Sequence, residues 1–185
     1  MTNKVSTTMK TLTTERLLLR MANSADAAFI LELYNSDDFI QFVGDKKLFT
    51  IEDAERYIQT SMLDMHEQKG VCLLVVESKS QGKQLGVCGL IKRDELEAYD
   101  LGYGFLPGEY RQGYGFESAQ AVISYAKERE DIKGLVAITT SDNISSQKLL
   151  TKLGFTYIKV QKPISDTIDL LLYQLSLVEH ETYTQ

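Results

Sequence analysis

Apolar residues recur along this chain at the spacing of strands in some stretches and at the spacing of helices in others. Residues 17–21 alternate between two faces, which predicts a first strand. Residues 27–34 carry apolar side chains at helical spacing, and Asn23 or Ser24 can cap that helix. The chain is therefore expected to begin its fold with a strand followed by a helix.

A second helix is predicted from a capping box, in which Thr50 and Asp53 satisfy each other's backbone N–H groups. This helix extends to about Lys69 and ends at Gly70. Residues 35–49, which precede it, have no clear period but contain three phenylalanines. These aromatic side chains either line a substrate cleft or anchor the loop in the core, and the sequence does not decide between the two.

Beyond residue 70 the pattern predicts strands on both sides of a central helix. Residues 119–126 place apolar side chains on one face of this helix, which begins near Gly115, and a shorter helix precedes Gly154. The predicted strands cover residues 71–76, 85–91, 101–106, 135–140, 155–160 and 168–177, with a turn at Pro163 between the last two. This order predicts an α/β fold with a mixed central sheet flanked by helices.

Composition narrows the class of protein. The 185 residues, 43% hydrophobic, suit a single domain, which we expect to cover residues 13–178 between polar tails at 1–12 and 179–185. A net charge of −6 argues against direct nucleic-acid binding. No run approaches the ~20 apolar residues of a membrane span, and no signal peptide is evident, so we expect a cytoplasmic protein with no membrane partner. Cys72 and Cys88 lie in apolar runs without zinc-ligand spacing, which predicts buried thiols and no metal site.

The first candidate site is a glycine-spaced turn, with Gly113 and Gly115, between the 101–106 strand and the central helix. The first N–H groups of a helix have no intrahelical acceptor and carry the positive end of its dipole. Glycines at this position let an anion approach, so the backbone of residues 112–116 can bind a phosphate or pyrophosphate. A tight turn without a ligand needs the same glycines. The P-loop lysine and the GxGxxG fingerprint are absent, which argues against ATP, GTP and NAD.

The second candidate site lies in residues 142–155. Asn143 precedes a short helix, and Ser146 follows one turn later on the same face as the apolar leucines of that helix. A polar side chain that points inward must find a partner or border a cavity. Ser146 is therefore either a core hydroxyl bonded back to the helix carbonyls or a group in a cleft.

Together, the two motifs resemble the acyl-CoA site of the GNAT superfamily of N-acetyltransferases. That family's C-terminal signature is similar to Asn143-x-x-Ser146-x-x-Leu149-x-x-Lys152-Leu153-Gly154-Phe155. The segments LTTERLLLR and LGYGFLP resemble the branch that acetylates the N-termini of ribosomal proteins, as does Tyr110, at a position where the family usually has Gln or Arg. The resemblance extends from about Leu12 to Leu177.

This resemblance implies the acyl-CoA N-acyltransferase fold and direct transfer of an acetyl group from acetyl-CoA to an amine in a ternary complex. It implies that backbone N–H groups of residues 112–116 hold the pyrophosphate, while the pantetheine arm contacts the Phe105 and Leu106 backbone and the Asn143 side chain. The implied cofactor site thus consists of Phe105, Leu106, Gln112, Gly113, Tyr114, Gly115, Phe116 and Asn143.

An amine attacks only in its neutral form, so the reaction needs a base or a desolvating pocket. Asp100 is the candidate base, since the ribosomal-protein branch often has Glu there, and its rivals are Glu95, Glu97 and Glu109. The backbone N–H of Leu106 is the candidate donor to the oxyanion of the tetrahedral intermediate.

The acid that protonates the leaving thiolate departs from the family pattern. Many family members use a tyrosine where this chain has Leu150. The resemblance to the ribosomal-protein branch gives this role to Ser146 instead, with Tyr103 or Tyr114 as alternatives.

The acceptor is expected to be a protein or peptide N-terminal α-amine, whose pKa of about 7.7–8.0 makes it easier to deprotonate than an alkylamine. The alternatives are a small amine, such as a polyamine or an antibiotic, and a non-catalytic acyl-CoA sensor. The sequence leaves a homodimer open.

Overall fold

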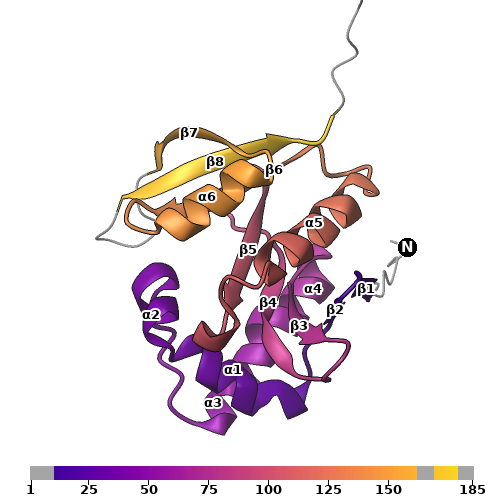
Figure 1. Ribbon diagram of the computed structural model, residues 1–185, viewed down its shortest axis with the longest axis vertical. Coiled ribbons are helices and arrows are strands. Elements are labelled where there is room, and N and C mark those ends of the chain that lie inside the picture. Colours follow the sequence, from indigo (N-terminus) through magenta and orange to yellow (C-terminus); the bar gives the residue numbers. More distant parts are fainter. Residues whose placement is uncertain (1–10, 162–168, 179–185) are drawn as a thin grey trace, which may run out of the picture.

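The computed structural model describes residues 11–161 and 169–178. The sheet has eight strands in the order β1-β2-β3-β4-β5-β6-β8-β7 (Figure 1). The strands are β1 (Leu12–Thr13), β2 (Leu17–Arg20), β3 (Leu73–Ser78), β4 (Gln84–Ile91), β5 (Tyr99–Phe105), β6 (Gly134–Thr140), β7 (Thr156–Gln161) and β8 (Leu170–Ser176). The helices are η1 (Ser24–Asp26), α1 (Ala27–Tyr34), α2 (Asp37–Val43), α3 (Ile51–Tyr57), η2 (Ile58–Leu63), α4 (Asp64–Lys69), η3 (Pro107–Glu109), α5 (Tyr114–Lys127) and α6 (Ile144–Lys152). The predicted mixed sheet flanked by helices is confirmed.

The sheet divides where β5 meets β6. Strands β4 and β5 are antiparallel and paired over their length, whereas the parallel pair β5 and β6 matches only Tyr99 with Leu135 and Asp100 with Val136. Beyond that point β6 continues beside β8 as far as Thr140. The two strands therefore diverge after Asp100, and Figure 1 shows β5 and β6 running apart.

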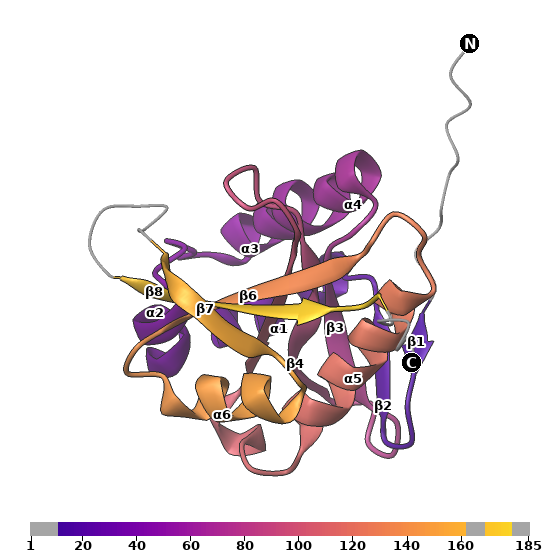
Figure 2. The ribbon, with the colours of Figure 1, turned by 90° about the horizontal axis from the view of Figure 1, so that it is seen from above.

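Helices cover both faces of the sheet (Figure 2). One buried cluster packs α1, α2, α3 and η2 against β3 and β4, with Val75 and Val87 as the strand contributions. The other packs the apolar face of α5, together with Leu150 of α6, against the opposite face. The predicted apolar positions of the central helix are thus buried as expected.

The long predicted helix forms as the run α3, η2 and α4, in which η2 is a π-helical stretch. Its capping box is present, since the Asp53 N–H donates to Thr50 Oγ1 and the Thr50 N–H donates to Asp53 Oδ2, both at 3.1 Å. Gly70 ends the run with φ of 70°. The boundaries predicted for this helix are confirmed.

The structure differs from the sequence-based expectations in two places. Residues 35–49 contain the helix α2, which spans seven residues and is too short for a helical period to stand out. Leu12, assigned to the N-terminal tail, pairs with Leu19 in β1. The Pro163 turn, residues 1–10 and residues 179–185 lie outside the described part of the chain.

Both cysteines are buried thiols, as predicted. Burial raises the pKa of Cys72 and that of Cys88 to about 12. Neither thiol is ionised near neutral pH, so neither is suited to act as a nucleophile.

Candidate active site

A cleft of about 400 Å³ opens where β5 and β6 diverge. Helix α2 and the residues after it form one wall, and β6 with the start of α6 forms the other. The residues that line it and carry polar side chains are Gln41, Lys46, Arg93, Asp100, Tyr103, Thr139, Thr140, Asn143 and Ser146. Most of the predicted catalytic groups are therefore brought to one cavity.

The aromatic residues of the 35–49 segment divide between the two roles left open by the sequence. Phe39 is 6% exposed, and its ring centroid lies 4.1 Å from that of Tyr34, so it anchors α2 in the core. Phe39 and Phe42 both line the cleft, whereas Phe49 is 76% exposed and lies outside it.

The glycine turn presents free backbone donors at the start of α5. Gly113 adopts φ of 81°, a conformation that glycine tolerates best, and its carbonyl accepts the first helical bond from the Glu117 N–H at 3.0 Å. The N–H groups of Tyr114, Gly115 and Phe116 precede that bond and so have no helical acceptor. The turn has the arrangement expected of an anion site.

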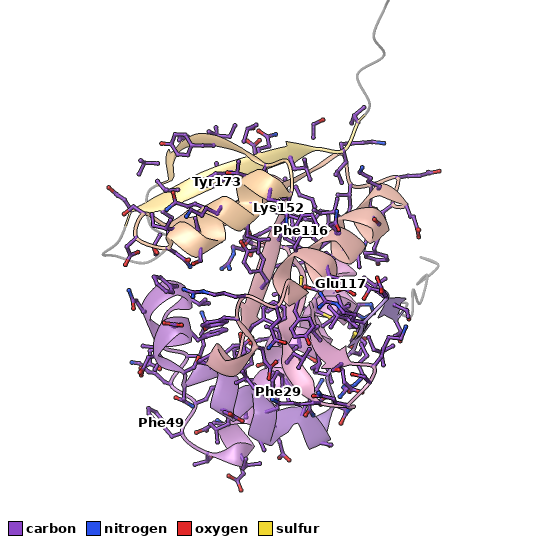
Figure 3. All side chains as sticks on the ribbon, in the orientation of Figure 1. Phe29, Phe49, Phe116, Glu117, Lys152 and Tyr173 are labelled. Atoms are coloured by element: carbon purple, nitrogen blue, oxygen red, sulfur yellow. The ribbon has the colours of Figure 1, made fainter. Side chains whose placement is uncertain are left out.

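Two cations lie beside this turn. Arg16 donates from Nε to Glu117 Oε2 at 2.7 Å and from Nη1 to the Gln112 carbonyl at 3.0 Å, and its guanidinium lies 4.7 Å from the centre of the Tyr114 ring. Lys152 Nζ lies 4.3 Å from the centre of the Phe116 ring, and Figure 3 shows these two side chains together between α5 and α6. Arg16 thereby neutralises Glu117, the one acidic residue in the first turn of α5.

The backbone of Leu106 is hydrogen-bonded within the fold. Its N–H donates to the Leu85 carbonyl at 3.0 Å, and its own carbonyl accepts from the Glu109 N–H at 2.9 Å. The Leu106 N–H is therefore not available to an oxyanion in this conformation, whereas its carbonyl oxygen keeps a second lone pair for a pantetheine N–H. Backbone groups alternate along an antiparallel strand, so those of Phe105 and Tyr103 point away from β4, toward the gap.

Asp100 is 2% exposed and lies at the point of divergence. Its Oδ2 accepts from Arg93 Nε at 2.7 Å, while its Oδ1 has no hydrogen-bond partner among the described residues. Burial raises the pKa of Asp100, and the Arg93 guanidinium and the Ile138 backbone amide lessen the rise. A buried carboxylate that borders a cleft and has one oxygen without a hydrogen-bond partner is suited to accept a proton.

Ser146 is paired with Tyr103. The two hydroxyl oxygens lie 2.8 Å apart, and the Tyr103 hydroxyl also lies 3.4 Å from the Ser146 carbonyl. Burial is the main cause that raises the pKa of Tyr103, so this hydroxyl keeps its proton. Asn143 caps α6 by accepting from the Ser146 N–H at 3.0 Å, which leaves its side-chain NH₂ for another partner.

The rival bases lie elsewhere. Glu109 forms an ion pair with Lys83, while Glu95 and Glu97 are exposed and do not line the cleft. Sequence reasoning missed Arg93 and Lys46 as cleft residues. Ile91 pairs with Asp100 in the hairpin of β4 and β5, and Arg93 follows Ile91 by two residues. This register would have pointed to Arg93, but it is not visible in the sequence.

None of the helices in the described part of the chain has the length and apolar character needed to cross a membrane. Within the same residues, no group of three or more His, Cys, Asp or Glu side chains is placed to hold a metal ion.

Comparisons with known proteins identify the family. Residues 16–156 match the model of the acetyltransferase (GNAT) domain. The chain is 28% identical to the uncharacterized N-acetyltransferase YoaA of Bacillus subtilis (strain 168), a match that covers 78% of this chain and 81% of YoaA.

Two solved structures share the fold. One is the microcin C7 self-immunity acetyltransferase MccE in complex with acetyl-CoA and AMP, with a TM-score of 0.76 and 20% identity over 88% of this chain and 93% of that one. The other, from Salmonella typhimurium, is an acetyltransferase that modifies the N-terminal serine of ribosomal protein L7/L12. Its TM-score is 0.73, with 20% identity over 88% of this chain and 96% of that one.

Proposed function

The chain belongs to the GNAT acetyltransferase family, and from that premise we propose that it acetylates the N-terminal α-amine of a protein or peptide. It is an acyl-CoA-dependent N-acetyltransferase, and acetyl-CoA is its donor. We further place its reaction in the cytoplasm, where the buried thiols of Cys72 and Cys88 stay reduced.

The donor site that we propose uses the start of α5 and the open edge of β5. The free N–H groups of residues 114–116, with Gln112 and Gly113 before them, would hold the pyrophosphate, and Arg16 keeps Glu117 from repelling it. The Phe105 backbone and the Asn143 NH₂ group would hold the pantetheine arm. Bound there, acetyl-CoA supplies an activated acetyl thioester.

The observation that carries the proposal is the buried Asp100 carboxylate, with Oδ1 unpaired, at the head of the cleft. In our proposal this oxygen removes the proton from the acceptor ammonium. Its raised pKa makes it a stronger base than an exposed carboxylate. Arg93 positions it through the bond to Oδ2.

Base strength favours an α-amine over an alkylamine. The α-ammonium of a peptide has a pKa of about 7.7–8.0 and that of a lysine-type amine about 10.4, a difference of roughly 2.5 units, or about 3.4 kcal/mol, in the proton transfer. A carboxylate base is weak, so this difference matters more here than it would with a stronger base. The acceptor named for the Salmonella neighbour, an N-terminal serine, is consistent with this choice.

We assign the leaving-group acid to the hydroxyl pair of Ser146 and Tyr103, with Ser146 as the group toward the thiolate. The pair lies across the gap from Asp100, because Asp100 and Tyr103 project from opposite faces of β5. Base and acid thus approach the gap from two sides.

The test combines acceptor panels with an Asp100→Asn variant. Release of CoA thiol should be fastest with peptides that have free N-termini, slower with polyamines and absent with N-terminally blocked peptides. Because a base must be ionised, the rate should rise with pH through a value above the usual carboxyl range. Asp100→Asn should lower turnover about 100-fold or more and remove this dependence, with CoA affinity kept.

Each outcome separates the alternatives. Preference for polyamines or aminoglycosides over every peptide would favour a small-amine acetyltransferase. CoA binding without turnover on any amine would favour a sensor. An Asp100→Asn variant that stays fully active would remove Asp100 from the mechanism.

A further inference from the structure

The polar lining of the cleft is unusual in its charge. Lys46, Arg93 and Asp100 are its only residues with ionised side chains among those described, so the lining carries one more positive than negative charge. The whole chain, by contrast, has a net charge of −6. A positive cleft in an acidic protein indicates selection for a ligand of the opposite sign.

Both cations have hydrogen-bonding capacity to spare. Arg93 uses Nε for Asp100, and its two Nη groups bond to none of the described residues. Lys46 Nζ makes one long contact of 3.5 Å, to the Val43 carbonyl, and is paired with no carboxylate in the described part of the chain. Four guanidinium N–H groups and an ammonium are thus available at the cleft.

The two cations also influence each other. Both side chains line the same cleft, and partial burial together with the charge of Arg93 lowers the pKa of Lys46. Asp100 offsets only one of these two positive charges, and a bound anion relieves the repulsion that remains.

This anion site adjoins the proposed base. Arg93 contacts Oδ2 of Asp100, and the free Oδ1 of the same carboxylate is where we place the acceptor amine. A ligand that fills both positions has its amine and its acidic group only a few bonds apart.

Building on the proposed function, we propose that the acceptor carries a carboxylate or phosphate close to its amine, and that Lys46 and Arg93 bind this acidic group. In a peptide acceptor, the group is an acidic side chain near the N-terminus. In a free amino acid, it is the α-carboxylate. A polyamine would instead bring its second cation against Lys46 and Arg93 and be disfavoured.

The test uses three peptides of equal length that differ only at the second residue, which is Glu, Gln or Lys. For the unaltered protein we expect kcat/KM to fall in the order Glu, Gln, Lys, with about a tenfold or greater difference between the first and last. Free glutamate and its amide, assayed beside the peptides, distinguish a small acceptor from a peptide.

The variant Lys46→Glu should reverse the order so that the Lys peptide becomes the better acceptor, with CoA affinity unchanged. Lys47→Glu is the matched control, because Lys47 is the next residue, is exposed and does not line the cleft. It should leave the order as in the unaltered protein.

Equal rates with all three peptides, or the same order after Lys46→Glu, would overturn this inference while peptide acetylation stood. Acetylation of free glutamate but of no peptide would uphold the inference and overturn the peptide acceptor. Failure of every amine would overturn both.

Discussion

At the residue scale, the two ends of the proposed donor site differ in how far sequence could define them. The glycine turn was predictable, because free N–H groups at a helix start follow from helix geometry alone. The hydrogen bond of Leu106 was not predictable, because a sequence shows that a backbone N–H exists but not whether Leu85 already accepts it. The pairing of Ser146 with Tyr103 joins residues 43 positions apart and depends on tertiary packing.

Substitution of Gly113 tests the proposed pyrophosphate site at the start of α5. Gly113→Glu should lower CoA affinity at least tenfold, measured by calorimetric titration, because a carboxylate would face the pyrophosphate at the start of α5. Any side chain is strained at this position, where φ is 81°, and its Cβ would lie 3.3 Å from Arg16 Nη2. Gly113→Ala is therefore the control, since it adds the strain without the charge. Equal affinities in the two variants would remove the electrostatic explanation.

Substitution of the hydroxyl pair tests the acid. Ser146→Ala and Tyr103→Phe should each lower turnover about 10- to 100-fold while CoA affinity stays within about twofold. The double variant should be no slower than the slower single variant, because the hydroxyls 2.8 Å apart act as one unit. The measurement is single-turnover transfer at saturating CoA. Losses that multiply in the double variant would show that the two groups act independently.

At the element scale, sequence periodicity identified the long elements and missed the short one. The helix that follows Thr50 was predictable from its cap and its length. Helix α2 has two turns, with acidic residues in the first and apolar residues on several sides of the second. Its apolar residues therefore show no helical periodicity by which the sequence could predict it. It matters for function nonetheless, because it forms one wall of the cleft.

The position of α2 depends on a close approach to β5. A Cβ at Gly104 would lie 3.0 Å from Phe39 Cε2, so Gly104→Ala should displace α2 and raise the KM of the acceptor several-fold, with CoA affinity little changed. Phe39→Leu in the same chain should recover part of the loss by removing the clashing ring atoms. Gly108→Ala, which meets no atom within 4 Å, is the control. The measurement is steady-state kinetics with acceptor and acetyl-CoA each varied. An unaltered KM for the acceptor would show that the position of α2 does not affect acceptor binding.

At the scale of the whole molecule, the fold class was predictable and the strand order was not. The alternation of apolar and polar residues and the length of the apolar runs predicted a mixed sheet. No local sequence pattern shows that β8 lies between β6 and β7, or that β5 and β6 separate after two residue pairs. These features depend on pairings between distant segments, which sequence pattern specifies weakly.

A buried ionic network around Asp26 joins the end of β2 to the start of β4. Asp26 is 1% exposed and accepts from Arg20 Nη1 and Nη2 at 2.8 Å, from the Asn23 N–H at 2.9 Å and from Gln84 Nε2 at 3.1 Å. Burial alone would raise the pKa of Asp26, but these hydrogen bonds outweigh it and the pKa is lowered. Asp26→Asn should reduce the free energy of unfolding by about 1.5–3 kcal/mol at pH 7, measured by urea denaturation.

The same group makes stability depend on pH. A carboxyl whose folded pKa lies below its unfolded value stabilises the protein above the unfolded pKa, and that contribution is lost as pH falls through the folded pKa. The difference between Asp26→Asn and the unaltered protein should therefore shrink as pH falls from 7 toward 3. A difference that stays constant over this range would show that ionisation of Asp26 is not its source.

The separation of β5 from β6 also governs which molecules can reach the exposed backbone of β5. A strand with unpaired amides at the rim of a sheet invites pairing with other chains. Here those amides lie in the interior, between α2 on one face of the sheet and α6 on the other. The two helices therefore shield the unpaired amides of Tyr103 and Phe105 from pairing with the edge strand of another chain.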